Sequence, residues 1–408
     1  TLNSNAAQQM GSGRGQVVDT ITYTAVDSEG NTYTKTIEVV VVRQAYGTGQ
    51  YVSDNQLEGE IYQINVETTG DGNAGTPEIV LGAGDDVVNV TQKMENMEID
   101  LGDGNNRFIV ASSGNALKGS VVSAGEGDNL IEVKGSDSAL ANSSQIVLGD
   151  GDNTVNLTGT WALFDKSGIV AGNGDNTFTM EGGVVGFNNS DESFIRTGDG
   201  KNTISVTGKD GRYGLSYGII ETGAGDDTIT VKTSGQSGMS NHSWINAGDG
   251  KNTIKVEGSQ GMDVQSYIMT GVGNDNIEVT GKTSHGMNGA AYIDAGAGEN
   301  TIIVSGTHGK EKASILSGAD ADTITVTGTK CYGIGSSTIN AGDGNNEINI
   351  SGTREGVYYS STVKTGSGDD KITIAGNMWG VKENSTIDAG DGNNVIDISG
   401  GSEHGLYN

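Results

Sequence analysis

The sequence predicts an all-β fold, a parallel β-solenoid (β-helix or β-roll) of about 14 rungs that follows a short N-terminal β-hairpin segment. Glycine supplies 68 of the 408 residues, a glycine-rich motif recurs from about residue 79, and apolar residues hold fixed places around each copy. So much glycine without a three-residue period is not collagen, and a single proline is unlike ordinary disorder. Long-period self-similarity is typical of stacked repeats, in which each rung is one turn of the solenoid.

The repeated motif has the core G-x-G-x-(D/N)-x-apolar-x-apolar, and we call its first glycine the anchor. Its 14 copies are spaced about 24 residues apart, and only one lacks the second glycine, where Asp320 stands. The anchors are Gly82, Gly102, Gly125, Gly149, Gly172, Gly198, Gly223, Gly248, Gly271, Gly296, Gly318, Gly342, Gly366 and Gly390. Each copy therefore predicts a strand, a tight glycine turn, a second strand and a variable loop.

Three columns of the alignment are apolar in every copy: the residues three before, six after and eight after the anchor. The last two share one face of a strand because strand side chains alternate. A small residue five before the anchor, such as Ser243 or Ala291, has the parity of the first column, so we expect it to point inward. A glycine followed by an apolar residue in the loop, as in Gly238–Met239, predicts a third inward corner.

The (D/N) position, four residues after the anchor, alternates from the Gly223 copy onward between Asp and Asn. We call this position the slot. Parallel stacking would put the slots in a column at about 4.8 Å. Aspartates at neighbouring slots would repel, whereas an asparagine amide can donate to an aspartate on either side. The alternation also indicates that two rungs were duplicated together.

Residues 16–42 alternate Val, Ile, Tyr and Thr on both sides of SEGN, which predicts a hairpin. The segment resembles the last two strands of the cadherin-like or immunoglobulin-like modules of bacterial adhesins. Such a module needs about seven strands, so we expect either an incomplete module or a strand-exchange element in residues 1–46. Residues 47–78 are expected to be a linker and solenoid cap, and residues 79–408 the solenoid.

The segments TGAGDDTIT (222–230) and TGSGDDKIT (365–373) resemble the nonapeptide of the RTX, haemolysin-type calcium-binding repeats. The resemblance covers the core of every rung. It implies a β-roll of a secreted protein that binds Ca²⁺ between stacked turns through the aspartate and backbone carbonyls. The chain departs from the family pattern because its leading glycine is usually Thr or Ala, its slot is Asn in nine rungs, and its motif occurs once per 24 residues or so.

The turns themselves also indicate a cation. Positions one to four after the anchors contain 20 of the 52 acidic residues, and stacked carboxylates repel unless a cation lies between them. The alternative is that Asp, Asn and Gly are simply good turn formers. The candidate Ca²⁺ ligands are Asp85, Asp86, Asp150, Asp152, Asp226, Asp227, Asp249, Asp275, Asp322, Asp369, Asp370 and Asp391.

An aromatic strip is predicted on the outer face of three consecutive rungs. Trp244, Tyr267 and Tyr292 each lie four residues before an anchor, with parity opposite to the apolar column. Such a strip could stack sugar rings or another protein, and we take these residues as candidate ligand-binding residues. The alternative is an aromatic ladder that only stabilises the sheet.

Composition excludes several function classes. The net charge of −29 opposes binding to nucleic acid and to anionic membranes, and no apolar run is long enough to cross a bilayer as a helix. The six arginines are scattered and no catalytic triad is recognisable, so we expect no enzyme. The four histidines lie in variable loops, where His285 and His308 could meet on adjacent rungs.

These observations lead us to expect an extracellular cell-surface protein with a structural or adhesive role, stabilised by calcium. The chain stops part-way through a rung and the hairpin has no evident partner, so we expect copies to associate head to tail by strand addition into a filament or lattice. Glycans are a further possible partner. The alternatives are a fragment of a longer adhesin and a calcium-binding accessory module of a secreted carbohydrate-active enzyme.

Overall fold

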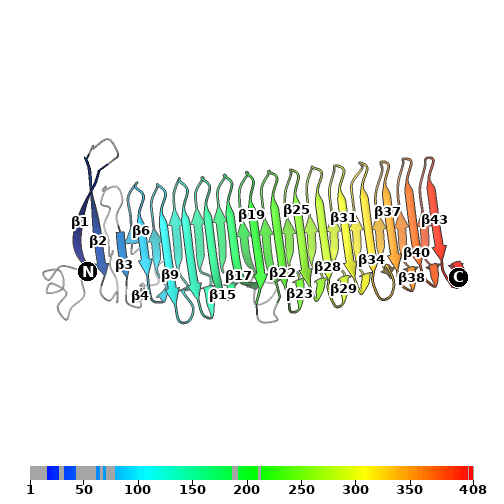
Figure 1. Cartoon of the computed structure of the whole chain (residues 1–408), viewed down its shortest axis with the longest axis horizontal. Helices are drawn as coiled ribbons and strands as arrows, with labels where there is room; N and C mark the ends of the chain where they lie inside the picture. Colours follow the sequence, from blue (N-terminus) through cyan, green and yellow to red (C-terminus); the bar gives the residue numbers. More distant parts are fainter. Residues whose placement is uncertain are drawn as a thin grey trace. The chain divides into compact units, whose positions relative to one another are not determined.

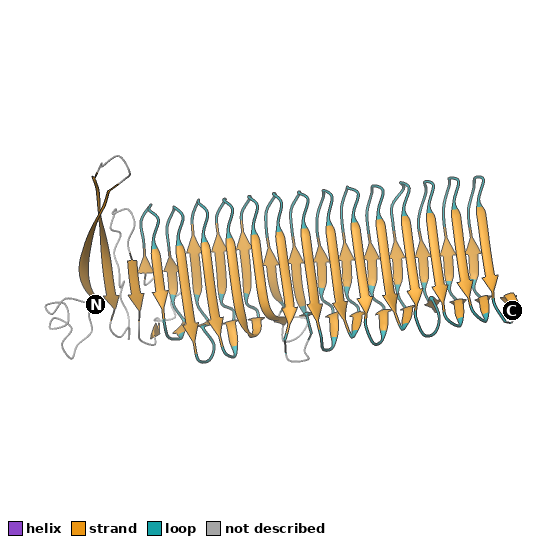
Figure 2. Cartoon of the chain, viewed as in Figure 1, coloured by secondary structure: helices purple, strands orange, loops and turns teal. Residues whose placement is uncertain are grey.

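The computed structural model confirms the all-β fold: a parallel β-solenoid of about 13 turns, close to the 14 rungs predicted. It describes residues 79–185, 192–209, 213–402 and 404–407 in full, and of residues 16–26, 32–42, 61–64 and 68–69 the backbone alone. Strands and turns account for the described residues, with no helix among them (Figure 2). The chain divides into two compact units, Thr1–Thr179 and Met180–Asn408.

Unit 1 opens with the predicted hairpin, in which β1 (Gln16–Val26) pairs antiparallel with β2 (Thr32–Val42). The hairpin is continued by strands of the same chain. β2 pairs in parallel with β3 (Ile61–Ile64), and β3 pairs in parallel with β6 (Val87–Val90). Strands of the solenoid pattern thus begin inside the segment expected to be linker and cap (Figure 1).

The rungs of unit 1 have three strand positions each: a long strand after the glycine turn, a short corner strand, and a strand before the next turn. The long strands are β3, β6, β9 (Arg107–Ser112), β12 (Leu130–Gly135) and β15 (Thr154–Phe164). The corner strands are β4 (Thr68–Thr69), β7 (Met94–Glu95), β10 (Leu117–Lys118) and β13 (Ser138–Ala141). The strands before the turns are β5 (Ile79–Val80), β8 (Glu98–Asp100), β11 (Val121–Ala124), β14 (Gln145–Leu148) and β16 (Gly168–Ala171).

Unit 2 repeats this arrangement, and the division between the units falls inside β17 (Thr177–Val185). Its long strands are β19 (Thr203–Gly208), β22 (Thr228–Thr233), β25 (Thr253–Gly258), β28 (Asn276–Gly281), β31 (Thr301–Gly306), β34 (Thr323–Gly328), β37 (Glu347–Gly352), β40 (Lys371–Gly376) and β43 (Val395–Gly400). Its corner strands are β20 (Leu215–Ser216), β23 (Ser237–Ser240), β26 (Gln260–Met262), β29 (His285–Met287), β32 (His308–Glu311), β35 (Ile334–Gly335), β38 (Glu355–Tyr358), β41 (Trp379–Lys382) and β44 (His404–Tyr407). Its strands before the turns are β18 (Ser193–Arg196), β21 (Gly218–Glu221), β24 (Trp244–Asn246), β27 (Tyr267–Met269), β30 (Tyr292–Asp294), β33 (Ser314–Leu316), β36 (Thr338–Asn340), β39 (Thr362–Lys364) and β42 (Thr386–Asp388).

Stacking aligns equivalent residues of successive rungs without slippage. Ile254 on β25 is opposite Ile277 on β28, and Ile277 is opposite Ile302 on β31, all in parallel pairs. All three side chains are at most 1% exposed. The predicted apolar columns are therefore confirmed as the core, and β-branched residues fill them because they suit a pleated, buried surface.

The predicted third corner is also confirmed, with one exception. Apolar corner residues such as Met262, Met287, Ile334 and Val357 are fully buried. In the rung between Met287 and Ile334 the same position is Lys310, whose side chain is 0% exposed. The sequence analysis did not identify this buried lysine.

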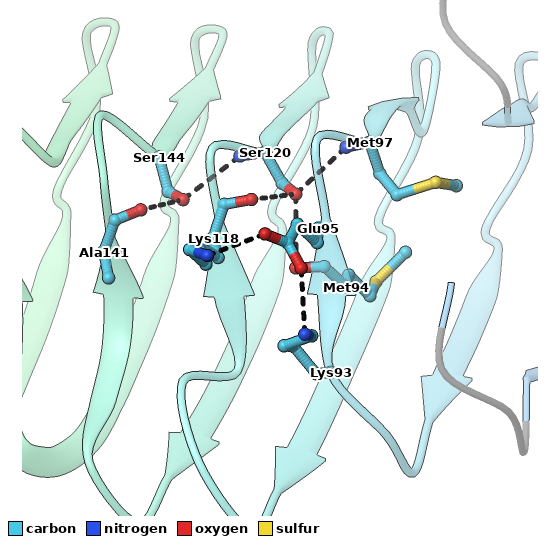
Figure 3. Close-up of polar contacts among 8 residues, drawn as sticks. All are labelled: Lys93, Met94, Glu95, Met97, Lys118, Ser120, Ala141 and Ser144. Atoms are coloured by element: carbon cyan, nitrogen blue, oxygen red, sulfur yellow. Dashed lines mark hydrogen bonds and ion pairs between the residues drawn. The ribbon is translucent and has the colours of Figure 1, made fainter. Parts of the chain in front are cut away.

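The small residues five before the anchors point inward as predicted, and several of the serines among them join neighbouring rungs. Figure 3 shows this in unit 1. The amide of Met97 donates to Ser120 Oγ (3.1 Å), and the amide of Ser120 donates to Ser144 Oγ (3.1 Å). Ser144 Oγ donates in turn to Ala141 O (2.7 Å). Each hydroxyl thus supplies an acceptor for a backbone amide at a corner where strand pairing is interrupted.

The second glycine of the motif is required by the close approach of successive turns. Gly250 has φ +112°, and a Cβ there would lie 2.1 Å from the carbonyl oxygen of Gly225 on the neighbouring rung. Only glycine allows both the backbone conformation and this contact. The turns therefore stack tightly enough for the side chains around them to reach from one rung to the next.

Candidate functional site

The slot residues form a buried polar column along the inside of the turns. In unit 1 the column contains Asp86 and then only asparagines, and in unit 2 it begins with Asn202 and alternates. Every member is at most 2% exposed except Asn394. The members are Asp86, Asn106, Asn129, Asn153 and Asn176 in unit 1, and Asn202, Asp227, Asn252, Asp275, Asn300, Asp322, Asn346, Asp370 and Asn394 in unit 2.

Within each unit, every slot side chain after the first accepts the backbone amide of the slot residue one rung earlier. The amide of Asp227 donates to Asn252 Oδ1 (3.1 Å), that of Asn252 to Asp275 Oδ1 (2.7 Å), and that of Asp275 to Asn300 Oδ1 (3.0 Å). In unit 1 the amide of Asn129 donates in the same way to Asn153 Oδ1 (3.1 Å). We call this column of hydrogen bonds the slot ladder.

Asparagine and aspartate differ in what their second side-chain atom can do. Asn252 Nδ2 donates to the carbonyl oxygens of Gly248 (3.2 Å) and Gly250 (3.2 Å) in its own turn. An aspartate has an oxygen in place of this donor. The Oδ2 atoms of the four unit 2 aspartates are buried without a hydrogen-bond partner; these residues are Asp227, Asp275, Asp322 and Asp370.

The residue just before the anchor changes together with the slot in the last eight rungs. It is Thr or Ser where the slot is Asp, and Ala where the slot is Asn. The pairs are Thr222 with Asp227, Ala247 with Asn252, Thr270 with Asp275, Ala295 with Asn300, Ser317 with Asp322, Ala341 with Asn346, Thr365 with Asp370 and Ala389 with Asn394. A hydroxyl residue therefore stands before the anchor in each rung whose slot is Asp, where the N–H donor of an asparagine is missing.

Burial opposes ionisation of Asp227, Asp275 and Asp322. Removal from water raises the pKa of Asp227, and the smaller opposing effects are the Thr222 hydroxyl and hydrogen bonds from Asn202. Burial likewise raises the pKa of Asp275 and of Asp322. A protonated carboxyl has one O–H donor. This donor can take the place of the asparagine N–H that bonds to the turn carbonyls.

The other predicted calcium ligands lie on the outside of the turns. Asp85, Asp150, Asp152, Asp226, Asp249, Asp369 and Asp391 are all exposed. Six of them accept a backbone amide of the following rung, as in Asn105 N to Asp85 Oδ1 (2.8 Å) and Lys251 N to Asp226 Oδ1 (2.8 Å). The twelve candidates do not form the single stripe that we expected. They divide between the buried slot ladder and this outer set.

The fit of these residues to calcium is limited. Among the residues that the structure describes, no group of three or more His, Cys, Asp or Glu side chains could hold a metal ion. Slot aspartates alternate with asparagines in unit 2, and six of the seven outer carboxylates already use one oxygen for a backbone amide. The orphaned Oδ2 atoms are the feature that fits a cation, and calcium there would need most of its six to eight oxygens from carbonyl and hydroxyl groups.

The predicted aromatic strip lies in register on neighbouring strands. Trp244 is opposite Tyr267, and Tyr267 is opposite Tyr292. All three are half-buried, on the face opposite the buried Ile245. The rings of Tyr267 and Tyr292 lie 6.4 Å apart, and Tyr292 Oη donates to Asp294 Oδ2 (3.2 Å).

A second aromatic row, which the sequence analysis did not identify as a site, lies along the corner strands of unit 2. The rings of His285 and His308 stack at 4.5 Å, so the two histidines do meet on adjacent rungs. The row continues from His308 to Tyr332 (4.8 Å) and from Tyr332 to Tyr358 (5.7 Å). The signal available in the sequence was one aromatic residue beside each corner glycine in successive loops.

Glu311 is the acidic centre of this row. His285 Nε2 lies 2.9 Å from Glu311 Oε2, and Tyr332 Oη donates to the same oxygen. Burial raises the pKa of Glu311, but the hydrogen bonds from Tyr332 and His285 outweigh it and the pKa is lowered overall. Burial and the hydrogen bond to Glu311 raise the pKa of Tyr332. Glu311 is therefore an ionised acceptor whose orientation is fixed.

Lys310 lies on the other face of the same strand, with Nζ bonded to Ala313 O (2.7 Å) and Thr338 O (2.7 Å). Burial lowers the pKa of Lys310 well below its usual value. A neutral amine has two N–H donors, and two carbonyls receive them. The inside of this rung therefore holds a lysine whose charge is disfavoured by burial, while its outside holds the Glu311 cluster.

Comparison with known proteins adds no relative: no family model, no curated protein and no solved structure matches the chain. Among the residues described, no helix has the length and apolarity to span a membrane. Function must therefore be argued from the surfaces and buried groups above.

Proposed function

We propose that this protein is a non-enzymatic structural and adhesive component of an extracellular surface, resembling the RTX solenoids and assembled from copies of itself. The observation that carries the proposal is the edge of β1, which pairs only with β2 among the described strands.

An unpaired strand edge accepts a further strand readily. We propose that β43 and β44 of a second copy add to this edge of β1. A head-to-tail contact of this kind propagates into filaments or a lattice. The net charge of −29 keeps other faces of the copies apart.

Electron microscopy and native mass spectrometry of the 408-residue chain test the assembly. We expect filaments or a concentration-dependent series of oligomers. Substitution of Leu406 and Ile396 by Asp should return the protein to a monomer, and Val272→Asp, at an exposed turn position (63% exposed), is the matched control. A parent chain that stays monomeric at every concentration would contradict the proposed self-association.

Calcium is the second part of the proposal, and it is supported by the acidic turns and by the orphaned oxygens of the slot aspartates. Thermal unfolding with calcium, with magnesium and with a chelator tests it. We expect chelation to lower the melting temperature, and calcium to restore it better than magnesium. An unchanged melt in chelator would leave the slot ladder alone as the account of these aspartates.

A further inference from the structure

A pocket opens beside the second aromatic row of unit 2, in front of Glu311. Its volume is about 280 Å³. The walls come from β32, β35 and β38 and the residues that follow them, and include Glu311, Lys312, Tyr332, Tyr358 and Tyr359. Three of these five side chains are tyrosines, in a chain whose aromatic content is only 5%. Three tyrosines of unit 2 thus line one concave site.

The acceptor in this pocket is held in place before any ligand arrives. Both hydrogen bonds to Glu311, from Tyr332 and His285, end on Oε2. Within the described residues no hydrogen bond is made to Oε1, which leaves this oxygen for a ligand. His285 is itself oriented, because its Nδ1 lies 3.1 Å from Ser284 Oγ. Preorganisation of this kind reduces the entropic cost of binding.

The aromatic wall offers ring faces at the surface. Tyr332 and Tyr358 stack at 5.7 Å with 27° between their planes, and Tyr359 lies 5.9 Å from Tyr358. Tyr359 is 54% exposed and has φ +46°. Most residues avoid this conformation, and a bulky side chain there is unusual. The equivalent position in other rungs is Asn241 or Glu383, so the fold itself does not need a tyrosine at this place.

Charge decides among the ligand classes that such a pocket could take. A cationic ligand is disfavoured because Lys312 is in the wall and Lys382 Nζ already lies 5.6 Å over the ring of Tyr358. An anionic ligand would meet the carboxylate of Glu311. A neutral polyhydroxylated ring meets neither objection. Its hydroxyls can donate to Glu311 and accept from Lys312, and its C–H faces can lie on the tyrosine rings.

We propose that this pocket binds a neutral sugar ring. Pockets for small molecules usually begin at about 300 Å³, so a volume of about 280 Å³ suits one ring or the end of a glycan chain. This site is separate from Trp244, Tyr267 and Tyr292, which lie on the strands before the turns. The inference gives the adhesive part of the proposed function a ligand class, and it does not depend on self-association.

Saturation-transfer NMR with methyl glycosides of glucose, galactose, mannose and N-acetylglucosamine tests the proposal on the full chain. We expect transfer to at least one of them, in the parent and in Trp244→Ala alike. Tyr359→Ala and Glu311→Ala should each weaken binding about tenfold or more, as expected for a central contact. Tyr332→Phe keeps the ring but releases Glu311, and it should also weaken binding.

Two results would overturn the proposal. One is the absence of transfer to all four glycosides. The other is binding that survives Tyr359→Ala and Glu311→Ala but disappears in Trp244→Ala, which would place the sugar on the first aromatic strip. Thermal melts of each variant confirm that the fold persists, and Tyr359→Ala is the safest substitution because its side chain is exposed. Electron microscopy of the same samples reports separately on self-association.

Discussion

The two units have the same apolar columns but differ in their slot ladders. In unit 1 four asparagines follow one another, and Asn129 Nδ2 donates to Asn153 Oδ1 (3.0 Å). In unit 2 carboxyls alternate with amides, and Asn202 Nδ2 donates to Asp227 Oδ1 (3.0 Å). An amide can repeat at every rung because it is both donor and acceptor, whereas a carboxylate needs an amide neighbour. The apolar columns are therefore equivalent in the two units, whereas the slot residues are not.

The largest effect should come from the apolar columns, where the units are equivalent. Ile131→Asp in unit 1 and Ile302→Asp in unit 2 each bury a charge at a residue that is 0% exposed. Urea denaturation should show a loss of about 4 kcal/mol or more for both. Ile303→Asp is the matched control, because its side chain is 39% exposed on the opposite face. Similar losses for Ile302→Asp and Ile303→Asp would refute the assignment of the core.

The slot ladder should separate the two units. Asn252→Asp would add a third carboxyl between those of Asp227 and Asp275. It should lower the free energy of unfolding by about 3 kcal/mol, because the amide donor of Asn252 is replaced by a buried carboxylate. Asn153→Asp in unit 1 keeps amides on both sides, at Asn129 and Asn176, and should cost less. Denaturation of the two variants at pH 7 measures the difference. Equal costs would mean that the alternation has no energetic basis.

Lys310 breaks the corner column of unit 2, while the corner residues of unit 1 from Met94 to Leu163 are apolar and buried. Lys310→Met restores the residue found in the neighbouring rung, and it should stabilise the protein by about 2 kcal/mol at pH 7. Burial lowers the pKa of Lys310 in the folded state. At pH values below the ordinary pKa of 10.5, the unfolded chain therefore binds a proton at this lysine that the folded chain binds less readily. The parent should therefore gain stability as the pH rises toward 10.5, and its deficit relative to the variant should shrink.

A constant difference between Lys310→Met and the parent from pH 7 to pH 10.5 would contradict a neutral buried amine. Lys312→Met, at a residue of the same strand region that lines the surface pocket, is the matched control. It should change stability little and should show no such pH dependence, because its charge remains hydrated.

The smallest effect concerns the protons of the slot ladder. The pKa of Asp227 is raised in the folded state, so the folded protein holds a proton that the unfolded chain releases above the ordinary value of 3.8. The parent should lose stability as the pH rises from 3.8 through the folded pKa. Asp227→Asn should match it at low pH and exceed it by about 1 kcal/mol at pH 7. Asp226→Asn, on the exposed side of the same turn, is the control: it retains Asp227, so its stability should fall with pH as that of the parent does.

Most of the fold could be predicted because it depends on local, repeated chemistry. The positions of Ile277, Met262 and Ser266 relative to their anchors determine that they point inward, and the model confirms all three. The pairing of β2 with β3 was missed because residues 61–64 carry no glycine motif. The two strands lie about 20 residues apart in the sequence, and no repeat in the sequence predicts that they pair.

The sites were less predictable for a different reason. The glycine turn brings Asp226 to the outside and Asp227 to the inside, although the two are adjacent and chemically identical. The motif alone does not reveal which of them is buried. Glu311 and Tyr332 come together only because two variable loops of different length stack, and their meeting depends on Lys310 occupying the inward position beside Glu311.

The central claim is that burial raises the pKa of carboxyls in the slot ladder of unit 2, where they alternate with amides that do not titrate. Carboxyl carbon NMR of the ¹³C-aspartate-labelled protein, titrated in chelator, tests it most directly. We predict that Asp227, Asp275 and Asp322 titrate above the ordinary value of 3.8, with assignments from single Asp→Asn variants. Titration of all three at or below that value would contradict the account, because the carboxyls would then be ionised in the folded solenoid and would need a cation rather than a proton.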